Sequence, residues 1–389
     1  MKKGTSPMYN VGIIGYGGFG MFLHRAWNGL DGVQVLAAAD QDPKRDPGGI
    51  RFYSTWQELV SDAEIEIVSI VTPPNTHAEI ACYAMQHGKH VLVEKPLATT
   101  LEDANQIIAI RDQTGCKAVV DYMQRFNPLV VGIEKLATEG MFGSLRRMVV
   151  ENYATDDSLS PKHWFWDRSI SGGIFVEHAV HFFDMTECFT ESNPIAVRGS
   201  AHRTSDGREN QVLATIVYNN GMMASHYHDF SRPGFFESTS IRLVFALAEI
   251  EMEGWIPVSG RLRCLCDPSR AAALLQLPDW DEVSRLAVND VEDISRPEGW
   301  GEVGQSKNES QVVIKDGERE IGVETMIVGN FAAAGTKADI YLTSLRDLQR
   351  DFLMTIENPD YTPKVRLEDG LHSLEIALRA DQWAHQSNH

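Results

Sequence analysis

The sequence predicts an α/β protein in which a doubly wound parallel sheet is followed by an α+β domain with a second sheet. Short apolar runs alternate with helical segments as far as residue 120, and a glycine-rich turn follows the first apolar run. Further strand-like segments lie between residues 146 and 251, and two helical segments follow residue 342. Strands that alternate with helices favour a parallel sheet, whereas successive strands followed by helices are typical of an α+β domain.

The first turn resembles a dinucleotide-binding loop in its composition and context. Residues 11–14 form an apolar run, and residues 21–30 have helical spacing. Between them lie Gly15, Tyr16, Gly17, Gly18, Phe19 and Gly20. Glycines here permit a tight turn, let the backbone approach a pyrophosphate and let the helix pack close to the strand, while free amides at the helix N-terminus favour the anion. These six residues are therefore predicted to bind the cofactor of a Rossmann domain.

Asp40 follows the second apolar run, residues 33–39, near the spacing of about 20 residues expected of the acid that binds the ribose hydroxyls. A carboxylate there accepts a hydrogen bond from the 2′-hydroxyl and repels a 2′-phosphate, so NAD is favoured over NADP. Lys44 and Arg45 follow closely and partly offset that repulsion. The alternative is an ordinary acid in a turn.

Polar segments follow three later strands of the same sheet. We expect strands at residues 65–72, 90–93 and 117–120, with helices at 76–87 and 101–114. The ligand of a doubly wound sheet lies beyond the carboxyl ends of its strands, so these segments converge on one rim. The further residues predicted to bind the cofactor are Thr72, Pro73, Asn75, His77, Glu94, Lys95 and Arg125.

The rest of the chain is expected to form a second domain. Expected strands lie at residues 146–154, 212–218, 222–230 and 240–251. Polar sequence with Pro and Gly over 278–322 predicts loops or an insertion, with an edge hairpin at 312–323, and helices are expected at 342–358 and 367–386. Residues 1–126 are thus assigned to the Rossmann domain and residues 127–389 to the second domain.

Several motifs together resemble the Gfo/Idh/MocA family of nicotinamide-dependent sugar and inositol oxidoreductases. Glu94-Lys95-Pro96 follows a valine-rich strand, with residues 72–77 (TPPNTH) before it and residues 124–128 (QRFNP) after it. A glycine pair, Gly172-Gly173, precedes an acid and a histidine four residues apart, and residues 367–374 open the final helix. The resemblance extends from residue 11 to about residue 383, except for a poorly matched stretch near 260–335.

The resemblance implies that the second domain has a large, open, mostly antiparallel sheet that binds substrate and mediates homo-oligomer contacts, as a dimer or tetramer. It implies that Lys95 is the active-site lysine and that His181 transfers the proton. Glu177 stands where related enzymes commonly have Asp. Because Glu is one methylene longer, its role as orienter of His181 or as substrate ligand stays open.

These residue types suit the oxidation of a secondary alcohol. His takes and returns a proton near neutral pH, and a Lys cation favours a developing alkoxide and lowers the pKa of a nearby histidine. If residues 175–184 form one helix, Glu177 and His181 lie at i and i+4 and can interact. Asp184, at i+3 from His181, is a further candidate ligand or orienter.

An aromatic segment before the glycine pair suits a sugar, because rings stack on C–H faces while polar groups bind hydroxyls. The alternative is that these rings cover a domain interface. Tyr122 and Arg125 are expected to contact nicotinamide or substrate. The alternative is that Tyr122 packs in the core and Arg125 forms a surface ion pair. His226 and His228 point the same way on a strand, where they bind an anionic substituent or line a pocket wall. The residues predicted to bind substrate are Lys95, Tyr122, His163, Trp164, Trp166, Arg168, Glu177, His178, His181 and Asp184.

No metal is expected. His178 and His181 beside Glu177 match no usual zinc spacing such as HExxH or paired CxxC. Cys264 and Cys266 are expected in a strand.

Composition excludes several classes of protein. The 389 residues include 35 Lys plus Arg and 54 Asp plus Glu, a net charge of −19 that disfavours nucleic-acid binding. No apolar stretch approaches the roughly 20 residues of a membrane span. Five scattered cysteines do not resemble a disulfide framework. We expect a soluble protein of the cytoplasm that binds no membrane.

The leading hypothesis is therefore an NAD-dependent dehydrogenase that acts on a secondary hydroxyl of a sugar, inositol or sugar derivative. One alternative is an NAD-dependent glycosidase, in which transient oxidation, elimination, water addition and re-reduction form a closed cycle; Glu177 and His178, beside His181, would supply its extra base. The other is a sensor that binds nucleotide without turnover.

Overall fold

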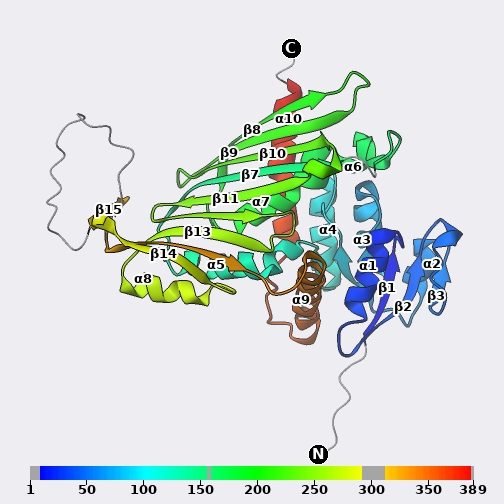
Figure 1. Ribbon diagram of the computed structural model, residues 1–389. Coiled ribbons are helices and arrows are strands. Elements are labelled where there is room, and N and C mark those ends of the chain that lie inside the picture. Colours follow the sequence, from blue (N-terminus) through cyan, green and yellow to red (C-terminus); the bar gives the residue numbers. More distant parts are fainter. Residues whose placement is uncertain (1–8, 156–158, 291–311, 387–389) are drawn as a thin grey trace, which may run out of the picture.

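The computed structural model describes residues 9–155, 159–290 and 312–386, which form two large sheets and a separate hairpin (Figure 1). The first sheet is wholly parallel and has the order β3-β2-β1-β4-β5-β6. Its strands are β1 (Tyr9–Ile14), β2 (Val33–Ala39), β3 (Arg51–Tyr53), β4 (Ile67–Ile70), β5 (His90–Val93) and β6 (Ala118–Val120). The connecting helices are α1 (Gly18–Trp27), α2 (Trp56–Ser61), α3 (His77–Gln86) and α4 (Leu101–Thr114).

This first sheet is the predicted Rossmann domain. All four residues of β4 are buried, as are the last four of β1, so helices cover both faces of the sheet. The bounds of β2, β5 and α4 agree with those predicted from the sequence. The carboxyl ends of β1, β4, β5 and β6 form the rim on which the polar segments were expected to converge.

The second sheet has nine strands in the order β14-β17-β13-β12-β11-β7-β10-β9-β8. All neighbours are antiparallel except β7 and β10, which run parallel. Its strands are β7 (Leu145–Thr155), β8 (Pro194–Arg203), β9 (Glu209–Tyr218), β10 (Met223–Arg232), β11 (Ser238–Phe245), β12 (Ala248–Glu253), β13 (Ser259–Cys266), β14 (Asp281–Ala287) and β17 (Thr325–Ala332). The accompanying helices are α5 (Pro128–Thr138), α6 (Arg168–Ser171), α7 (Val180–Glu187), α8 (Pro268–Ala273), α9 (Lys337–Glu357) and α10 (Leu367–Gln386).

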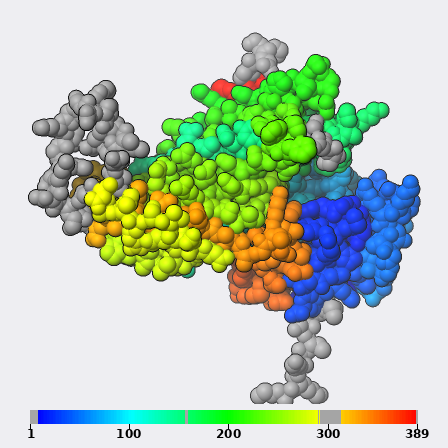
Figure 2. Space-filling model, in the orientation of Figure 1, coloured from blue at the N-terminus to red at the C-terminus, as the bar shows by residue number. Residues whose placement is uncertain are grey.

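One face of the second sheet is covered and the other is open. Alternate residues of β9, beginning with Val212, are buried against the layer that contains α7 and α10. At Gly199 in β8, an added Cβ would lie 2.0 Å from the carbonyl oxygen of Ala380, so α10 touches this strand at its backbone. Leu213 and Met223 point to the opposite, exposed face, and Figure 2 shows the green strands of this face at the surface.

The two C-terminal helices also contact the first sheet's domain. α9 packs on α1, and α10 contacts α4 and β6. An added Cβ at Gly370 would lie 2.9 Å from the Leu97 Cβ and 3.2 Å from a Val120 methyl group, so α10 lies directly on this part of the domain. In Figure 2 the orange segment that includes the start of α9 lies between the blue domain and the yellow-green sheet. Both helices were predicted from the sequence and are confirmed.

Two predictions for the second sheet were wrong. Residues 240–251 form a hairpin of β11 and β12, because the Ala246 and Leu247 amides donate to the carbonyls of Ser144 and Phe142 and reverse the chain. No Gly, Pro or Asn marks this turn. The stretch predicted as loops at 278–322 contains β14, an edge strand whose residues are mostly exposed and therefore lack an apolar pattern.

The remaining expectations for this region are met in part. The hairpin at 312–323 exists as β15 (Val312–Asp316) and β16 (Arg319–Val323), but it forms its own two-stranded sheet. Residues 291–311 of the predicted insertion lie outside the described residues. Cys264 and Cys266 lie in β13, as predicted. Within the described ranges, no helix is long and apolar enough to cross a membrane.

Candidate active site

The glycine-rich turn has the geometry that a dinucleotide needs. Gly15 has φ +91, and an added Cβ would lie 2.5 Å from the Val71 carbonyl oxygen; at Gly20 it would lie 2.1 Å from the Gly15 carbonyl oxygen. Around Gly18 the space is open, and the N-terminus of α1 carries no side-chain cap. Free amides at the start of a helix fit a pyrophosphate. The chain therefore fits NAD at this turn.

Asp40 faces this turn from the end of β2. Its carboxylate accepts the Tyr16 amide at 2.8 Å and the Arg45 guanidinium at 2.9 Å. Burial alone would raise the pKa of Asp40, but hydrogen bonds from the Asp42 amide, Arg45 and the Tyr16 amide lower it overall. The carboxylate is thus ionised, and Arg45, whose side chain is 50% exposed, lies against it within reach of Gly17.

The segment after β4 is fixed by its own histidine. One His77 ring nitrogen lies 2.8 Å from the Pro96 carbonyl oxygen and the other 2.9 Å from the Thr72 carbonyl oxygen. His77 is fully buried, so it connects two rim segments rather than facing the crevice. Thr72 and Pro73 are half-buried and Asn75 is exposed, which leaves these three available to a ligand.

Lys95 reaches across to the second domain. Its Nζ donates to the Glu177 carboxylate and to the Glu177 carbonyl oxygen, each at 2.7 Å. Each side chain is 13% exposed. Burial would raise the pKa of Glu177, but Lys95 and His178 hold it below its usual value. The result is an ion pair at the meeting of the two domains with limited access to solvent.

His181 lies near the start of α7, beside this pair. Its ring packs edge-on against Trp255 at 5.1 Å and Tyr122 at 6.5 Å between centroids. Its Nδ1 is buried with no hydrogen-bond partner in the described part of the chain. Burial, followed by the charge of Lys95, puts the pKa of His181 well below 6.5. The ring is therefore neutral and able to accept a proton.

The expected contact between Glu177 and His181 is not formed. Residues 175–184 are not one α-helix, because Phe175–Ala179 adopts a wider π-helical turn before α7 begins. Among the described residues, Glu177 bonds Lys95 and no hydrogen bond joins it to His181. Glu177 therefore positions the lysine, and the sequence had no signal for the wide turn.

Further histidines extend from His181 into the sheet. His178 Nε2 lies 2.9 Å from the Asn152 side-chain oxygen, and burial lowers the pKa of His178 to about 4. His228 packs on His178 with centroids 5.3 Å apart. His226 and His228 are both fully buried, as expected for side chains that point the same way from β10. They lie beneath the site as neutral packing groups.

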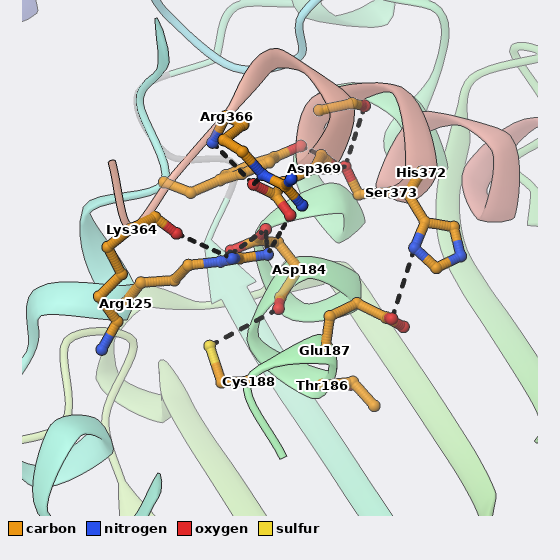
Figure 3. A network of polar contacts seen from close by, with 12 residues as sticks. Arg125, Asp184, Thr186, Glu187, Cys188, Lys364, Arg366, Asp369, His372 and Ser373 are labelled. Atoms are coloured by element: carbon orange, nitrogen blue, oxygen red, sulfur yellow. Dashed lines mark hydrogen bonds and ion pairs between the residues drawn. The ribbon is translucent and has the colours of Figure 1, made fainter. Parts of the chain in front are cut away.

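Arg125 and Asp184 were predicted at the cofactor and the substrate, but they face each other (Figure 3). Arg125 donates to both Asp184 oxygens, the shortest contact being 2.7 Å, and also to the Lys364 carbonyl oxygen. Asp369 of α10 lies 3.3 Å from the guanidinium. The Asp184 side chain is 1% exposed, and burial raises its pKa although Arg125 opposes the rise. This network joins the first domain to α7 and α10.

Two other predicted substrate residues have structural partners. Tyr122 is buried, and its hydroxyl hydrogen-bonds Ser373 of α10. Arg168 pairs with Asp381 at 2.6 Å and with Glu209 at 3.3 Å. The polar groups of both side chains are thus bound within the protein. Of these two residues, Tyr122 borders His181 through its ring.

The aromatic segment borders the site through His163. The side chain of His163 accepts the Phe165 amide, and its ring packs on Trp164 at 5.2 Å. His163 is also near enough to Glu177 to lower its pKa. Trp166 packs edge-on against Phe165 and Phe230.

Two residues that border the site were not predicted from the sequence, and a third was expected only as part of the polar segment 121–127 at the rim. Trp255, after β12, packs on His181 and on Tyr341 of α9. Asp121, the first residue after β6, faces Glu94. The position of Asp121 after a strand was a usable signal, whereas Trp255 and Tyr341 come from segments with no motif. In the described ranges, no group of three or more His, Cys, Asp or Glu could hold a metal.

Two family models match the chain. The model described as "Oxidoreductase family, NAD-binding Rossmann fold" (GFO_IDH_MocA) matches residues 9–122, and the "GFO/IDH/MocA C-terminal domain" model matches residues 130–244. Together they match more than half of the 389 residues.

Curated relatives match over part of their length. UDP-N-acetylglucosamine 3-dehydrogenase from Acidithiobacillus ferrooxidans is 27% identical over 220 residues, 55% of this chain and 65% of that protein. Inositol 2-dehydrogenase from Rhizobium meliloti is 26% identical over 194 residues, 49% of this chain and 57% of that protein. The matched part therefore spans less than two thirds of either relative.

A solved structure shows the same fold over nearly the whole chain. The crystal structure of GenD2 from gentamicin A biosynthesis, in complex with NAD, matches with a TM-score of 0.72 at 16% identity. The match covers 99% of this chain and 96% of that one.

Proposed function

The chain belongs to the Gfo/Idh/MocA family of oxidoreductases, and from this premise we propose that it transfers a hydride between a secondary hydroxyl of a sugar, inositol or sugar derivative and NAD. The observation that carries the proposal is the neutral, buried His181 beside the Lys95–Glu177 pair, at the rim that also holds the glycine-rich turn. A base and a cation at one rim are the groups that alcohol oxidation needs.

Each residue has a separate task in this proposal. Lys95 hydrogen-bonds the substrate oxygen and stabilises the negative charge that develops on it. His181 accepts the hydroxyl proton, and in the reverse direction returns it. Glu177 positions Lys95 through its carboxylate and its carbonyl oxygen. Bound NAD would accept the hydride from the substrate carbon. The packing of Trp255 and Tyr122 around His181 restricts water near the proton-transfer step.

We place the cofactor at Gly15–Gly20, with Asp40 at the adenosine ribose and Thr72, Pro73, Asn75 and Glu94 along the rim. The ionised Asp40 supports NAD as the preferred cofactor, because a carboxylate repels a 2′-phosphate. Arg45 limits that preference, since it neutralises Asp40 and has room to turn outward.

The proposed substrate is a carbohydrate or cyclitol. The relatives named above support it, because their names specify a sugar nucleotide and an inositol. Within this chain, His163 and Trp164 offer a polar edge and an aromatic face near Glu177. Polar groups beside rings suit a polyhydroxylated ring with apolar C–H faces.

We also propose that two or more copies associate through the open face of the second sheet and that the protein works in the cytoplasm. Leu213 and Met223 on that face support the first proposal. The five cysteines, which are all free, support the second.

A substrate screen tests the function. Purified protein is incubated with sugars, inositols and aryl glycosides while NADH absorbance and aglycone release are followed together. NADH formed in proportion to oxidised substrate supports the dehydrogenase. Aglycone release without net NADH, from protein that retains NAD, would replace it with the glycosidase cycle. Cofactor binding without either product across the screen would favour a nucleotide sensor.

A further inference from the structure

A row of rings connects the glycine-rich turn to His181. Phe19, in the turn, lies 6.1 Å from Tyr341 between ring centroids. Tyr341 lies 5.7 Å from Trp255, and Trp255 packs edge-on against His181 at 5.1 Å. Phe19, Tyr341 and Trp255 are partly buried, so each keeps some surface open to a ligand. The row therefore runs along the rim from the turn proposed for the phosphates to the proposed base.

Buried side chains fix the middle of this row. Trp255 lies in the turn between β12 and β13, and two amide side chains that follow β6 hold that turn. The Gln124 Nε2 donates to the Trp255 carbonyl oxygen at 2.6 Å, and the Asn127 Nδ2 donates to the Pro257 carbonyl oxygen at 2.9 Å. Both amides are buried. Tyr341 is held by α9, which packs on α1. A surface that is already in place costs a ligand less ordering on binding.

The order of the strands indicates which half of a dinucleotide can reach these rings. In the first sheet, β2 lies on one side of β1, and β4, β5 and β6 lie on the other. A dinucleotide binds across the point where the strand order reverses, with its pyrophosphate at the turn after β1. If its adenosine lies at Asp40, after β2, its nicotinamide half must extend over the ends of β4, β5 and β6. Trp255 is on that side, because it is bound by Gln124, just after β6.

Resting on the proposed function, we propose that Trp255 and Tyr341 form the surface that the nicotinamide ring contacts. The turn after β12 and α9 then bind the cofactor together with the first sheet's domain. Flat aromatic rings bind one another favourably in offset or edge-on contacts. Because Trp255 also packs on His181, one side chain sets the position of the nicotinamide relative to the proposed base. The ADP-ribose half of the cofactor does not reach these rings.

ADP-ribose provides the first test, because it contains every part of NADH except the nicotinamide. Dissociation constants for both nucleotides are measured by calorimetry on the wild type, Trp255→Leu and Tyr341→Leu, with circular dichroism as the check on folding. Each variant should weaken NADH binding by about threefold to tenfold, as expected for a lost aromatic contact, and leave ADP-ribose binding unchanged. Equal weakening of both nucleotides, or no change in either variant, would overturn the inference. A wild-type protein that binds neither nucleotide would instead reject the proposed function.

Two further variants separate the contact from general packing. Trp255→Phe keeps an aromatic ring and should retain most of the NADH affinity that Trp255→Leu loses. Trp280→Leu is the matched control, because Trp280 is also partly buried but lies against Gly329 of β17, near the edge of the second sheet. It should leave both dissociation constants unchanged. A selective loss of NADH affinity in Trp280→Leu as large as that in Trp255→Leu would contradict the assignment.

Energy transfer from tryptophan to bound NADH gives a readout that is independent of turnover. Because the transfer falls steeply with distance, an indole beside the nicotinamide should contribute strongly. At saturating NADH, Trp255→Phe should therefore lower the transferred emission by more than Trp280→Phe does. An equal loss in the two variants would mean that the nicotinamide lies away from Trp255. A higher KM for the substrate in Trp255→Leu, with NADH affinity unchanged, would make Trp255 a wall of the substrate pocket and would also overturn the inference.

Discussion

Two ion pairs join the first domain to the segment that contains His181, and they differ in what surrounds them. Lys95 and Glu177 are each 13% exposed, and the Lys95 Nζ makes two contacts, both to Glu177. Arg125 and Asp184 are 11% and 1% exposed, and Arg125 also contacts Asp369 and the Lys364 carbonyl oxygen. The first pair keeps a cation that can turn to a ligand. The second is enclosed by three segments of the chain, so its charges are fixed and serve the fold.

The largest effect is expected at the accessible pair and its histidine. His181→Ala and Lys95→Met should each lower kcat by about 10²–10⁴, the usual contribution of a positioned acid or base. NADH binding should change little, because the phosphate turn and Asp40 are untouched. Steady-state turnover and NADH fluorescence titration measure the two effects.

A matched control separates catalysis from folding in these variants. His226→Ala removes a buried histidine of the same type from β10, with no contact to Lys95. It should lower stability while leaving kcat per folded molecule within a few-fold of wild type. Near-wild-type turnover in both His181→Ala and Lys95→Met would reject the site.

The enclosed pair should show the opposite pattern. Arg125→Met leaves Asp184 buried without its cation, which typically costs about 3–5 kcal/mol of unfolding free energy. Urea unfolding followed by circular dichroism measures this loss. Because Arg125 is assigned to the fold, kcat of the folded fraction should stay within a few-fold of wild type.

Replacing both partners sharpens that result. Arg125→Met combined with Asp184→Leu removes the unpaired charge and should recover most of the lost stability. A large fall in kcat for Arg125→Met at full folding would show instead that this pair acts in the reaction, and the contrast between the two pairs would disappear.

The sequence predicted every strand and connecting helix of the first domain except the short strand β3 and the short helix α2. Strands such as β2 and β5 are continuous apolar runs, and the turn at Gly15–Gly20 has a form set by close backbone contacts. The hairpin of β11 and β12 could not be predicted, because its turn depends on carbonyl groups of residues 142 and 144, about a hundred positions earlier. β14 was missed because an exposed edge strand has no apolar alternation.

The site was predictable in its residue types but not in its pairings. Lys95 and His181 follow motifs that a sequence displays directly. Whether Asp184 faces the substrate or Arg125 depends on the wide turn before α7, which shifts the register of every later residue in that helix. Trp255 packs on His181, and Tyr341 packs on Trp255, only because distant segments come together, so no local pattern marks them.

A third ion pair tests whether exposure distinguishes functional from structural pairs. Arg45 is 50% exposed and pairs with Asp40 at the proposed ribose site. Asp40→Ala removes the charge that repels a 2′-phosphate and frees Arg45 to bind one, so the ratio of kcat/KM for NAD over NADP should fall by about tenfold. Arg45→Ala should raise that ratio. An unchanged ratio in Asp40→Ala would remove Asp40 from the ribose site.

The smallest effect concerns how the accessible pair sets the charge around His181. The pKa of His181 lies well below 6.5, first through burial and then through Lys95, so the acidic limb of the kcat/KM profile for oxidation should lie well below that of an ordinary histidine. Glu177→Gln removes the anion that balances the charge of Lys95. The unbalanced cation should lower the pKa of His181 further and move the acidic limb to lower pH, by less than one unit. The direction of the shift follows from the role of His181 as the base. Protonation of His181 stops the reaction, so a lower pKa of His181 keeps the protein active at lower pH. An acidic limb that stays in place in Glu177→Gln, or that moves to higher pH, would contradict this electrostatic account, because the loss of a nearby anion favours the neutral form of His181.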